Sequence, residues 1–539
     1  MRIAIFHGYE LTGSGSNEYT RYLAAALAAD GHTVFVACRE PHPESVAEVS
    51  AALAWDHQGE ARTLFGTPGL PGQVTLHQLP HASVRPVYVT DKQREGNVKA
   101  FIDLSDAELS EVRSVAVQGL GAALAAYPPD VVHANHLVLQ PTIAADVCAP
   151  LGIPYVIYPH GSDIEYTIRR DRRYLELAGQ AIVQSAGIIS GSAEMIERLQ
   201  GLYPRLADDL ESRSHIVGVG VDVSLFAPVA PGDRWASIAR FAETRPGGGK
   251  PAEQRAELVD RLDRGELSAV SDYHNTYAHD LPDDDVAERL QQVPWGSGHV
   301  MLFVGALTAG KGLQSLIAAM PAILTHVPDA HLVIVGSGTY RETLEALVHA
   351  LAAGDGVLLD DLVALGGDLE GGRTARGWPD VAAYVADPQR RAEMLQAGPG
   401  FAEHIHFTGR LDHSRLKSVF PCADLAVFPS LLPEAYPLVL MESLSSGVLP
   451  AASDTTGLRE GLTLLEPHLG AAVVDRLRLP MDPEVRVAAI AQRLTSLLTR
   501  PTADDSHEQL RSIAVAEYDW SVRAAAMAEA YESLIAATR

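Results

Sequence analysis

One stretch of the chain decides the fold: Asp424-Leu-Ala-Val-Phe-Pro-Ser-Leu-Leu-Pro-Glu-Ala-Tyr-Pro-Leu-Val-Leu-Met-Glu-Ser-Leu-Ser-Ser-Gly447. After Asp424 comes an uninterrupted apolar run, Leu425–Phe428, followed by a loop and a helix pattern that begins near Leu438. An apolar run without polar alternation is typical of a strand buried on both faces of a parallel sheet. Pro437 suits the first helical turn, where its missing N–H costs nothing. The stretch therefore predicts one strand–loop–helix unit of a parallel α/β sheet.

Similar apolar runs alternate with longer amphipathic stretches along most of the chain. A helix is expected at Asn17–Asp30, capped by Ser16 or Asn17 and followed by Gly31. The alternation predicts an α/β fold of two Rossmann-like, doubly wound domains, with ligands bound outside the carboxyl ends of the strands, in the cleft where the domains face each other. The other runs lie at 2–6, 33–37, 87–89, 130–133, 154–158, 187–190, 215–217, 300–304, 331–335, 404–407, 449–452 and 471–474.

Two polar segments interrupt this alternation and set the expected domain boundaries. The first domain is predicted at 1–215, completed by a C-terminal helix at 516–539, and the second domain at 299–515. Residues 231–298, rich in Asp, Glu, Arg, Gly and Pro, are expected to form an insertion or linker. Residues 354–401, polar and rich in Gly, are expected to form a second insertion. Both are interpreted as surface additions rather than extra core.

Composition narrows the class of protein. The 539 residues carry 42 Lys and Arg against 68 Asp and Glu, a formal charge of −26 that disfavours a nucleic-acid partner. No apolar run approaches the 18 residues or so of a membrane span.

The first residues, 1–8, are typical of a buried strand rather than a signal peptide. Cys38, Cys148 and Cys422 lie far apart, which favours reduced thiols in a cytoplasmic protein. Asp283–Asp285 is interpreted as solvated charge, and no metal is implied.

The helix that begins near Leu438 offers the first chemical clue. The unpaired N–H groups of Leu438 and Val439 would form an anion site. Glu434 precedes this terminus and Glu442 follows it by one turn, an arrangement that suits a phosphate flanked by sugar hydroxyls. The alternative is that both glutamates only complement the helix dipole, worth about 0.3–1 kcal/mol each.

The same segment resembles the E-x7-E signature of retaining family 4 glycosyltransferases of the GT-B fold, the group 1 glycosyltransferases that include glycogen- and sucrose-synthase-like enzymes. Further segments resemble other elements of that family, in the right order and across the whole chain apart from the two insertions. They are Gly13–Tyr19, Tyr158–Asp163, Val219–Asp222 with Phe226, Phe303–Gly312, Val335–Gly338, Phe407–Arg410, and Asp519–Trp520 with Tyr531.

The resemblance implies a retaining hexosyltransferase that uses a nucleotide-diphosphate sugar, UDP-sugar slightly favoured over GDP- or ADP-sugar, with no cofactor and no enzymic nucleophile. The first domain would bind the acceptor and the second the donor. Lys311 would neutralise the departing diphosphate, with Glu434 on the sugar and Glu442 on the ribose. His160 would lie beside the transferred sugar. The remaining ligand-binding positions implied are Gly13, Gly15, Gly305, Gly409, Arg410, Tyr436, Leu438 and Val439.

The sequence departs from the family pattern at the diphosphate loop. Ala306 stands where the family usually has an arginine directly after Val-Gly. Ala435 and Pro437 stand where glycines are common. We expect Lys311 with the helix start, or another arginine such as Arg410, to replace the missing cation.

Other functions remain open on the residues alone. A nicotinamide-dependent oxidoreductase would need G-x-G-x-x-G after the first strand, but Gly13-x-Gly15-x-x continues into Glu18. A sugar-nucleotide epimerase, a glycan phosphorylase and a non-catalytic sugar-nucleotide-binding protein share the predicted architecture. The cluster Arg169–Arg173 would suit an anionic acceptor, although a solvated helix face is favoured.

Overall fold

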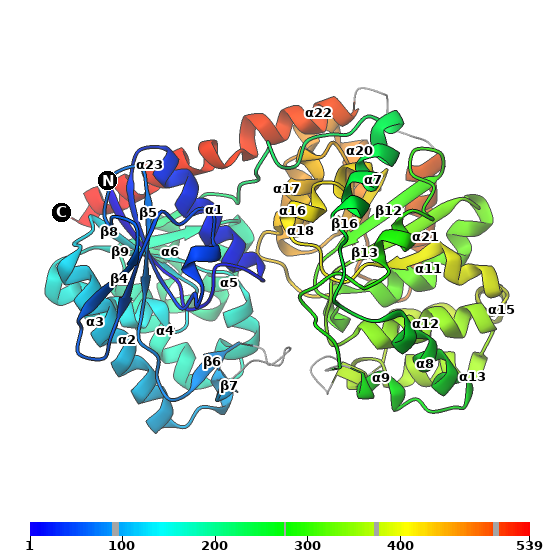
Figure 1. Ribbon diagram of the computed structural model, residues 1–539, viewed down its shortest axis with the longest axis horizontal. Coiled ribbons are helices and arrows are strands. Elements are labelled where there is room, and N and C mark those ends of the chain that lie inside the picture. The colour runs from blue at the N-terminus through cyan, green and yellow to red at the C-terminus, as the bar shows by residue number, and fades with distance from the viewer. Residues whose placement is uncertain (89–95, 274–275, 371–376, 500–505, 539) are drawn as a thin grey trace. The chain divides into compact units, whose positions relative to one another are not determined.

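The computed structural model describes residues 1–88, 96–273, 276–370, 377–499 and 506–538 (Figure 1). The chain forms two compact units. The first unit comprises Met1–Val221, Ala435–Leu438 and Ala516–Arg539, and the second comprises Asp222–Glu434 and Val439–Val515. Each unit contains its own large, mainly parallel sheet, so the fold is α/β.

The described part of the first unit holds one nine-stranded sheet in the order β11-β10-β9-β8-β1-β2-β5-β3-β4. Its strand pairs are parallel except β3 with β4, which run antiparallel at one edge. A separate short parallel pair joins β6 to β7. The strands are β1 (Arg2–Phe6), β2 (Thr33–Cys38), β3 (Ala51–Trp55), β4 (Ala61–Phe65), β5 (Val74–Gln78), β6 (Arg85–Val87), β7 (Val98–Ala100), β8 (Val131–Asn135), β9 (Tyr155–Tyr158), β10 (Gly187–Ser190) and β11 (Ser214–Ile216).

Helices cover this sheet and close its core. The C-terminal helix α23 packs against α1, while α3 packs against both α2 and α4 (Figure 1). The apolar core beneath them includes Phe35, Leu120, Ile143 and Ile157. The helices of the first unit are α1 (Gly15–Ala29), α2 (Asp106–Ala126), α3 (Gln140–Leu151), α4 (Arg172–Gln184), α5 (Ala193–Leu202), α6 (Ala207–Ser212) and α23 (Trp520–Thr538).

In the described part of the second unit, six parallel strands form a sheet in the order β14-β13-β12-β15-β16-β17. The strands are β12 (His299–Val304), β13 (Ala330–Val335), β14 (Ile405–Phe407), β15 (Leu425–Phe428), β16 (Leu449–Ser453) and β17 (Arg478–Leu479). The helices are α7 (Arg234–Glu243), α8 (Ala252–Asp263), α9 (Ala269–Asp272), α10 (Val286–Leu290), α11 (Leu313–His326), α12 (Arg341–Ala353), α13 (Gly356–Leu365), α14 (Pro379–Val385), α15 (Pro388–Leu395), α16 (His413–Leu416), α17 (Leu438–Ser445), α18 (Thr456–Thr463), α19 (Glu466–Leu469), α20 (Ala471–Leu477), α21 (Arg486–Thr499) and α22 (Ser506–Ile513).

Local predictions fail in two places for identifiable reasons. The strand expected at 471–474 is helix α20, because Val474 and Leu477, three residues apart, are its buried positions. The cap of α1 is Ser14 rather than Ser16 or Asn17, and Ser14 caps without a side-chain hydrogen bond. The end of α1 is as expected, since Gly31 follows it with φ of +89°. The last residue of the run predicted at 87–89, Val89, lies outside the described residues.

The segment 231–298 is part of the core of the second unit, which contradicts its interpretation as a surface insertion. Trp295, Phe241 and Lys250 are among its fully buried side chains. The Trp295 indole N–H donates to the backbone oxygen of Leu290 at 2.6 Å. The segment therefore forms part of the core of the second unit and is not a surface insertion.

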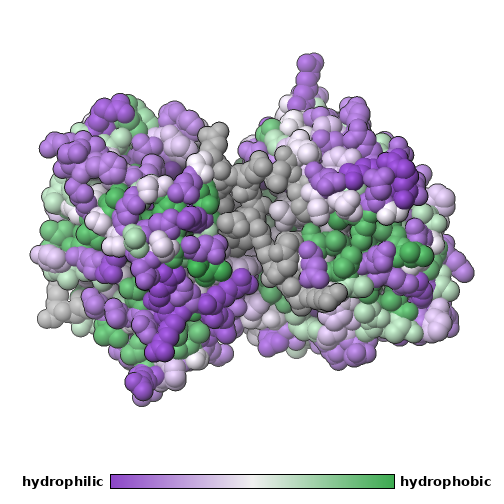
Figure 2. Space-filling model, turned by 90° about the horizontal axis from the view of Figure 1, so that it is seen from below, coloured by the Kyte–Doolittle hydropathy of each residue, from purple (hydrophilic) through white to green (hydrophobic). Residues whose placement is uncertain are grey.

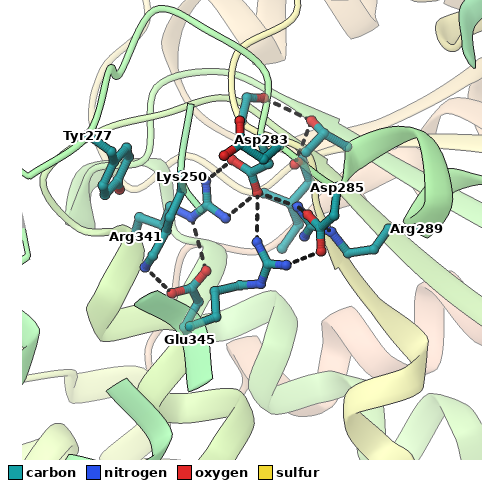
Figure 3. Close-up of polar contacts among 12 residues, drawn as sticks. Lys250, Tyr277, Asp283, Asp285, Arg289, Arg341 and Glu345 are labelled. Carbon is teal, nitrogen blue, oxygen red and sulfur yellow. Dashed lines mark hydrogen bonds and ion pairs between the residues drawn. The ribbon is translucent and has the colours of Figure 1, made fainter. Parts of the chain in front are cut away.

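A buried charge cluster joins this segment to α12 (Figure 3). The Arg341 guanidinium donates to both carboxylate oxygens of Asp283, each at 2.6 Å. Lys250 Nζ donates to Glu342 at 2.8 Å and to Glu345 at 2.5 Å. Asp283 is fully buried, so its interpretation as solvated charge is wrong. The four cations of the cluster balance its four anions: Lys250, Arg255, Arg289 and Arg341 with Asp283, Asp285, Glu342 and Glu345.

The segment 354–401 also contributes core, again contrary to expectation. Leu359, Leu362 and Phe401 are buried. The buried Trp378 donates its indole N–H to the Tyr340 hydroxyl at 2.5 Å. Its composition is polar because the helices formed here bury only one face.

Hydrophilic residues cover much of the face seen in Figure 2, with smaller groups of hydrophobic residues among them. Among the described residues, no helix is long and apolar enough to cross a membrane. Cys38, Cys148 and Cys422 are buried free thiols, as the sequence predicts. Burial raises the pKa of the Cys38 thiol to about 12, so this sulfur is an unreactive core atom.

Candidate functional site: strand-end loops of the two units

Three glycines follow neighbouring parallel strands of the second unit and bring their backbones together. Gly305 follows β12, Gly336 follows β13 and Gly409 lies just beyond β14. The Gly336 N–H donates to the Gly409 carbonyl at 2.9 Å, and the Gly305 N–H donates to the Val335 carbonyl at 3.0 Å. A Cβ at Gly336 would lie 1.8 Å from the Gly305 oxygen. Only glycine fits this edge, which is built of backbone alone.

Lys311 lies at the same edge, in the turn between β12 and α11. Gly312 ends this turn with φ of +71°, and a Cβ there would lie 1.9 Å from the Pro429 oxygen. The turn is thus pressed against the loop that follows β15. Lys311 Nζ forms an ion pair with Glu434 Oε1. The sequence therefore identifies two residues, 123 positions apart, that the structure brings into contact.

Glu434 is held by several further contacts. The Ser430 hydroxyl donates to Glu434 Oε1 at 2.8 Å, and the Glu434 N–H donates to Thr456 Oγ1 at 2.8 Å. The Gly457 N–H donates to the Glu434 carbonyl at 2.9 Å. Thr456 has φ of +42°, an uncommon conformation for a β-branched residue, and such strain clusters at functional sites. Neither Ser430 nor Thr456 is marked by a motif in the sequence.

Glu442 is the second glutamate of the segment and lies in α17. Its side chain is 5% exposed, and its Oε1 lies 3.0 Å from Nε2 of His413. Oε2 is buried and has no hydrogen-bond partner among the described residues. His413 begins α16 and belongs to none of the motifs quoted from the sequence. This carboxylate therefore keeps one oxygen available for a hydrogen-bond donor.

Arg410 lies in the loop after β14, which the segment 231–298 holds in place. The Asp283 N–H donates to the Thr408 carbonyl at 2.9 Å, and the Arg410 N–H donates to the Leu281 carbonyl at 3.2 Å. The Arg410 side chain is half-buried and forms no ion pair within the described part of the chain. The Arg410 guanidinium acts electrostatically on Asp412, and the loop thus presents this cation on a fixed backbone.

The predicted donor-side positions divide between the units. Val439 groups with the second unit together with Glu434 and Glu442. Tyr436 and Leu438, although close in sequence, belong to the Ala435–Leu438 segment that groups with the first unit.

In the first unit, the glycine-rich stretch forms the start of α1. Gly13 has φ of +101°, which favours glycine, and its N–H donates to Glu18 Oε1 at 3.5 Å. Gly15 is already the first residue of the helix, and a Cβ there would meet nothing within 4 Å. The structure thus requires glycine at position 13 and leaves open space at position 15.

His160 follows β9 and belongs to a network of hydrogen bonds. Its Nε2 lies 2.7 Å from Asn135 Oδ1, and His133 Nε2 lies 3.3 Å from the same oxygen. Burial lowers the pKa of His160 well below its ordinary value and that of His133 to about 4, so both are neutral at pH 7. Each Nε2–H then donates to Asn135, and His133 Nδ1 accepts from the Tyr531 hydroxyl at 2.7 Å. His160 Nδ1 remains as an acceptor.

The network includes three residues of this unit whose role at the site was not predicted: His133, Asn135 and Tyr531. Tyr531 was identified only as part of the returning C-terminal helix. Asn135 and His133 lie at the end of β8, next to β9 in the sheet, so the carboxyl ends of adjacent parallel strands bring them to His160. Their polar character within an apolar run was the available signal.

Two family models match the chain. The Glycosyl transferase 4-like domain matches residues 14–207. The model described as Glycosyl transferases group 1 matches residues 287–359 and 389–513. This chain is therefore a glycosyltransferase with a 4-like domain and a group 1 domain.

Relatives of this glycosyltransferase match about half of its length. A phosphatidyl-myo-inositol mannosyltransferase of Mycobacterium tuberculosis is 25% identical over 251 residues, 46% of this chain and 50% of that protein. A glycogen synthase of the same organism is 25% identical over 232 residues, 43% of this chain and 42% of that protein. The chain thus spans about half the length of the curated relatives it matches.

Solved structures show the same GT-B fold. Sucrose-phosphate synthase from Thermosynechococcus elongatus aligns with a TM-score of 0.54 at 17% identity, covering 99% of each chain. Anabaena HepE in complex with UDP and glucose aligns with a TM-score of 0.54 at 14% identity, covering 99% of this chain and 100% of that chain.

The basic cluster of this glycosyltransferase is a charge-paired surface. Arg172 pairs with Glu176 at 2.8 Å, and its side chain is 87% exposed. Arg173 pairs with Asp171 at 2.8 Å. These contacts fit the solvated helix face that the sequence favours.

Proposed function

We propose that this glycosyltransferase moves a hexosyl unit from a nucleotide-diphosphate sugar to an acceptor hydroxyl and retains the anomeric configuration. The second unit would bind the donor and the first unit the acceptor. The observation that carries the proposal is the ion pair of Lys311 with Glu434, next to the start of α17 in the sequence and at the edge built by Gly305, Gly336 and Gly409.

The donor diphosphate would bind where positive charge and free N–H groups gather. The first turn of α17 leaves its N–H groups without intrahelical acceptors and favours an anion. Lys311 supplies a compact cation, and Arg410 would supply the charge that Ala306 lacks. Removing one such donor to a developing charge typically costs about 2.7–4 kcal/mol of transition-state stabilisation.

The two glutamates would hold the sugar and the ribose. Glu442 Oε2, buried without a partner among the described residues, would accept from a ribose hydroxyl. Glu434 Oε1 accepts from both Lys311 and Ser430. A sugar hydroxyl would compete with these two donors for the carboxylate and would weaken the ion pair with Lys311.

Retention fits a front-face displacement in which the leaving phosphate helps to deprotonate the acceptor hydroxyl. The chain then needs no nucleophile of its own. His160, neutral at pH 7 with its Nε2–H on Asn135, would accept from a sugar hydroxyl through Nδ1. It would orient the sugar rather than carry a proton.

A UDP-sugar is the first donor to test, because HepE, similar in fold, has been solved with UDP and glucose. The experiment is a thermal-shift screen of UDP-, GDP- and ADP-sugars, followed by measurement of nucleotide release and of product configuration by NMR. We expect one nucleotide sugar to raise the Tm. Lys311→Met should lower kcat by about 100- to 1000-fold. Lys417→Met, at an exposed lysine, should leave kcat unchanged.

Three outcomes would contradict the proposal. Binding of no nucleotide sugar would rule out the transferase. Consumption of free phosphate without a nucleotide would indicate a phosphorylase, and interconversion of the donor without an acceptor would indicate an epimerase. An inverted product would refute retention alone.

A further inference from the structure

A small pocket in the first unit lies apart from the donor-side residues. It opens at the carboxyl ends of β1, β2 and β5 and is flanked by α2 and the start of α3. Its apolar wall includes Leu79 and Ile143, and its polar wall includes His7, Arg39 and Gln140. The pocket thus combines a cation and an amide with an apolar floor.

Arg39 is the cationic side chain of this pocket, and the Glu10 carboxylate acts on it electrostatically. It follows β2, and its backbone N–H donates to the Tyr9 carbonyl at 3.0 Å. The guanidinium makes no hydrogen bond or ion pair with any described residue, although the chain carries a formal charge of −26. The neighbouring Arg85 is already paired with Glu10. Burial lowers the pKa of Arg39, but an arginine remains protonated at neutral pH.

Gln140 provides a second, independent indication of a ligand. The side chain is 5% exposed, its Oε1 is buried without a partner among the described residues, and no hydrogen bond of its amide nitrogen to them is found. Gln140 is also the first residue of the 12-residue helix α3, whose first-turn N–H groups favour an anion. A Cβ at Gly8 would lie 1.6 Å from Gln140 Nε2, so the glycine at the end of β1 makes room for this amide.

Ring contacts lead from the pocket wall to His160, the first of them stacked and the second tilted. The His7 ring, which lines the pocket, lies 5.7 Å from that of His136 between centroids. The His136 ring lies 4.5 Å from that of His160. Both ring nitrogens of His136 are buried and lack a hydrogen-bond partner among the described residues. The pocket wall thus lies two ring contacts from His160, the residue proposed to face the transferred sugar.

We propose that this pocket binds a phosphate or carboxylate group of the acceptor. The inference rests on the proposed function, and it names the acceptor as an anionic, hydroxylated small molecule or head group. Arg39 would donate two N–H bonds to the oxyanion, supported by the start of α3. The Gln140 amide would donate to the same group or accept from a neighbouring hydroxyl. The pocket thereby fixes which acceptor hydroxyl faces the donor.

The first experiment measures oxyanion binding by the full chain with inorganic phosphate and acetate as probes, by calorimetric titration. Arg39→Met should weaken binding of at least one probe by roughly tenfold or more. Arg62→Met removes an exposed arginine of β4 in the same unit and should change nothing. Lys311→Met, on the donor side, should leave this site intact. Equal affinities for wild type and Arg39→Met would overturn the proposal.

The second experiment measures transfer to matched acceptors. A hexose phosphate or a hexuronate should be a better acceptor than the neutral hexose, and Arg39→Met should raise KM for the anionic acceptor with a smaller effect on kcat. Vesicles of phosphatidylcholine with phosphatidylinositol, compared with the soluble sugar phosphate, tell whether the anion belongs to a lipid or a free sugar. Preference for the neutral hexose would refute the proposal. The Tm shift with nucleotide sugar, measured in parallel, tests the proposed function separately.

Discussion

Lys250 is the residue through which the buried charge cluster can be tested most directly. It is fully buried, and its Nζ donates to Glu342 and Glu345. Lys250→Met keeps the apolar stem and removes the charge. Glu345 then still pairs with Arg341 at 3.0 Å, and Glu342 keeps the Tyr277 hydroxyl at 2.9 Å. The variant therefore breaks the buried ion pair of Lys250 with Glu342 and leaves Glu345 with a cation.

Breaking a buried ion pair by removing one partner costs about 3–5 kcal/mol. For a unit of this size, each kcal/mol shifts Tm by about 2–4 °C, so we expect the second unit to melt about 6–20 °C lower. Differential scanning calorimetry with nucleotide-free protein would resolve this transition. Lys250→Met combined with Glu342→Gln should recover much of the loss, because glutamine keeps an acceptor for Tyr277 and carries no charge.

The control is Arg264→Met, which breaks an ion pair of the same segment at a side chain that is 59% exposed. Exposed pairs contribute about 0–1 kcal/mol, so its Tm should change little. If Lys250→Met also costs less than about 1 kcal/mol, or if the double variant is no more stable than the single one, the cluster does not hold segment 231–298 in place.

Three further predictions concern the site and the buried histidines. Glu442→Gln should weaken donor binding by about tenfold in a thermal-shift titration, because a hydrogen bond to a charged group contributes about 1.5–3 kcal/mol. Gly409→Ala should weaken donor binding and lower Tm, because the Cβ would lie 2.7 Å from the Asp283 nitrogen in a residue with φ of +72°. Burial lowers the pKa of His7 and His133 to about 4, so only the unfolded chain takes up these protons as pH falls from about 6.5. Urea unfolding of the first unit should show stability falling by about 3 kcal/mol per histidine between pH 6.5 and 4, partly offset by Asp163, whose pKa burial raises to about 6.

The sequence predicts the central strands well because strands buried on both faces leave an uninterrupted apolar signal. Residues 2–6 and 187–190 form strands with those bounds. Edge strands leave a weaker signal: the first three residues of β4, Ala61–Phe65, are exposed. The strand predicted at 471–474 was wrong because a run of four apolar residues does not distinguish the period of a strand from that of a helix.

The site was predictable where strand order alone brings residues together. Lys311 and Glu434 follow β12 and β15, which are neighbours in the sheet, so parallel topology places both at one edge. The partners of Glu442 and Asp283 were not predictable, because those contacts depend on how helices and a long segment pack. Asp283 pairs with a residue 58 positions away, and no local pattern encodes that pairing.

The charge cluster also bears on which cation could take the place of the arginine that is absent at position 306. The cluster consumes four cations in neutral pairs, so they are not available to a diphosphate. Asp283, which they neutralise, hydrogen-bonds through its backbone N–H to Thr408, and its neighbour Pro282 bridges to Gly409. The segment that carries Asp283 thereby fixes the loop that presents Arg410. We therefore propose that Arg410, on a loop held by a segment whose polar composition had suggested surface, supplies the cation that is absent at position 306.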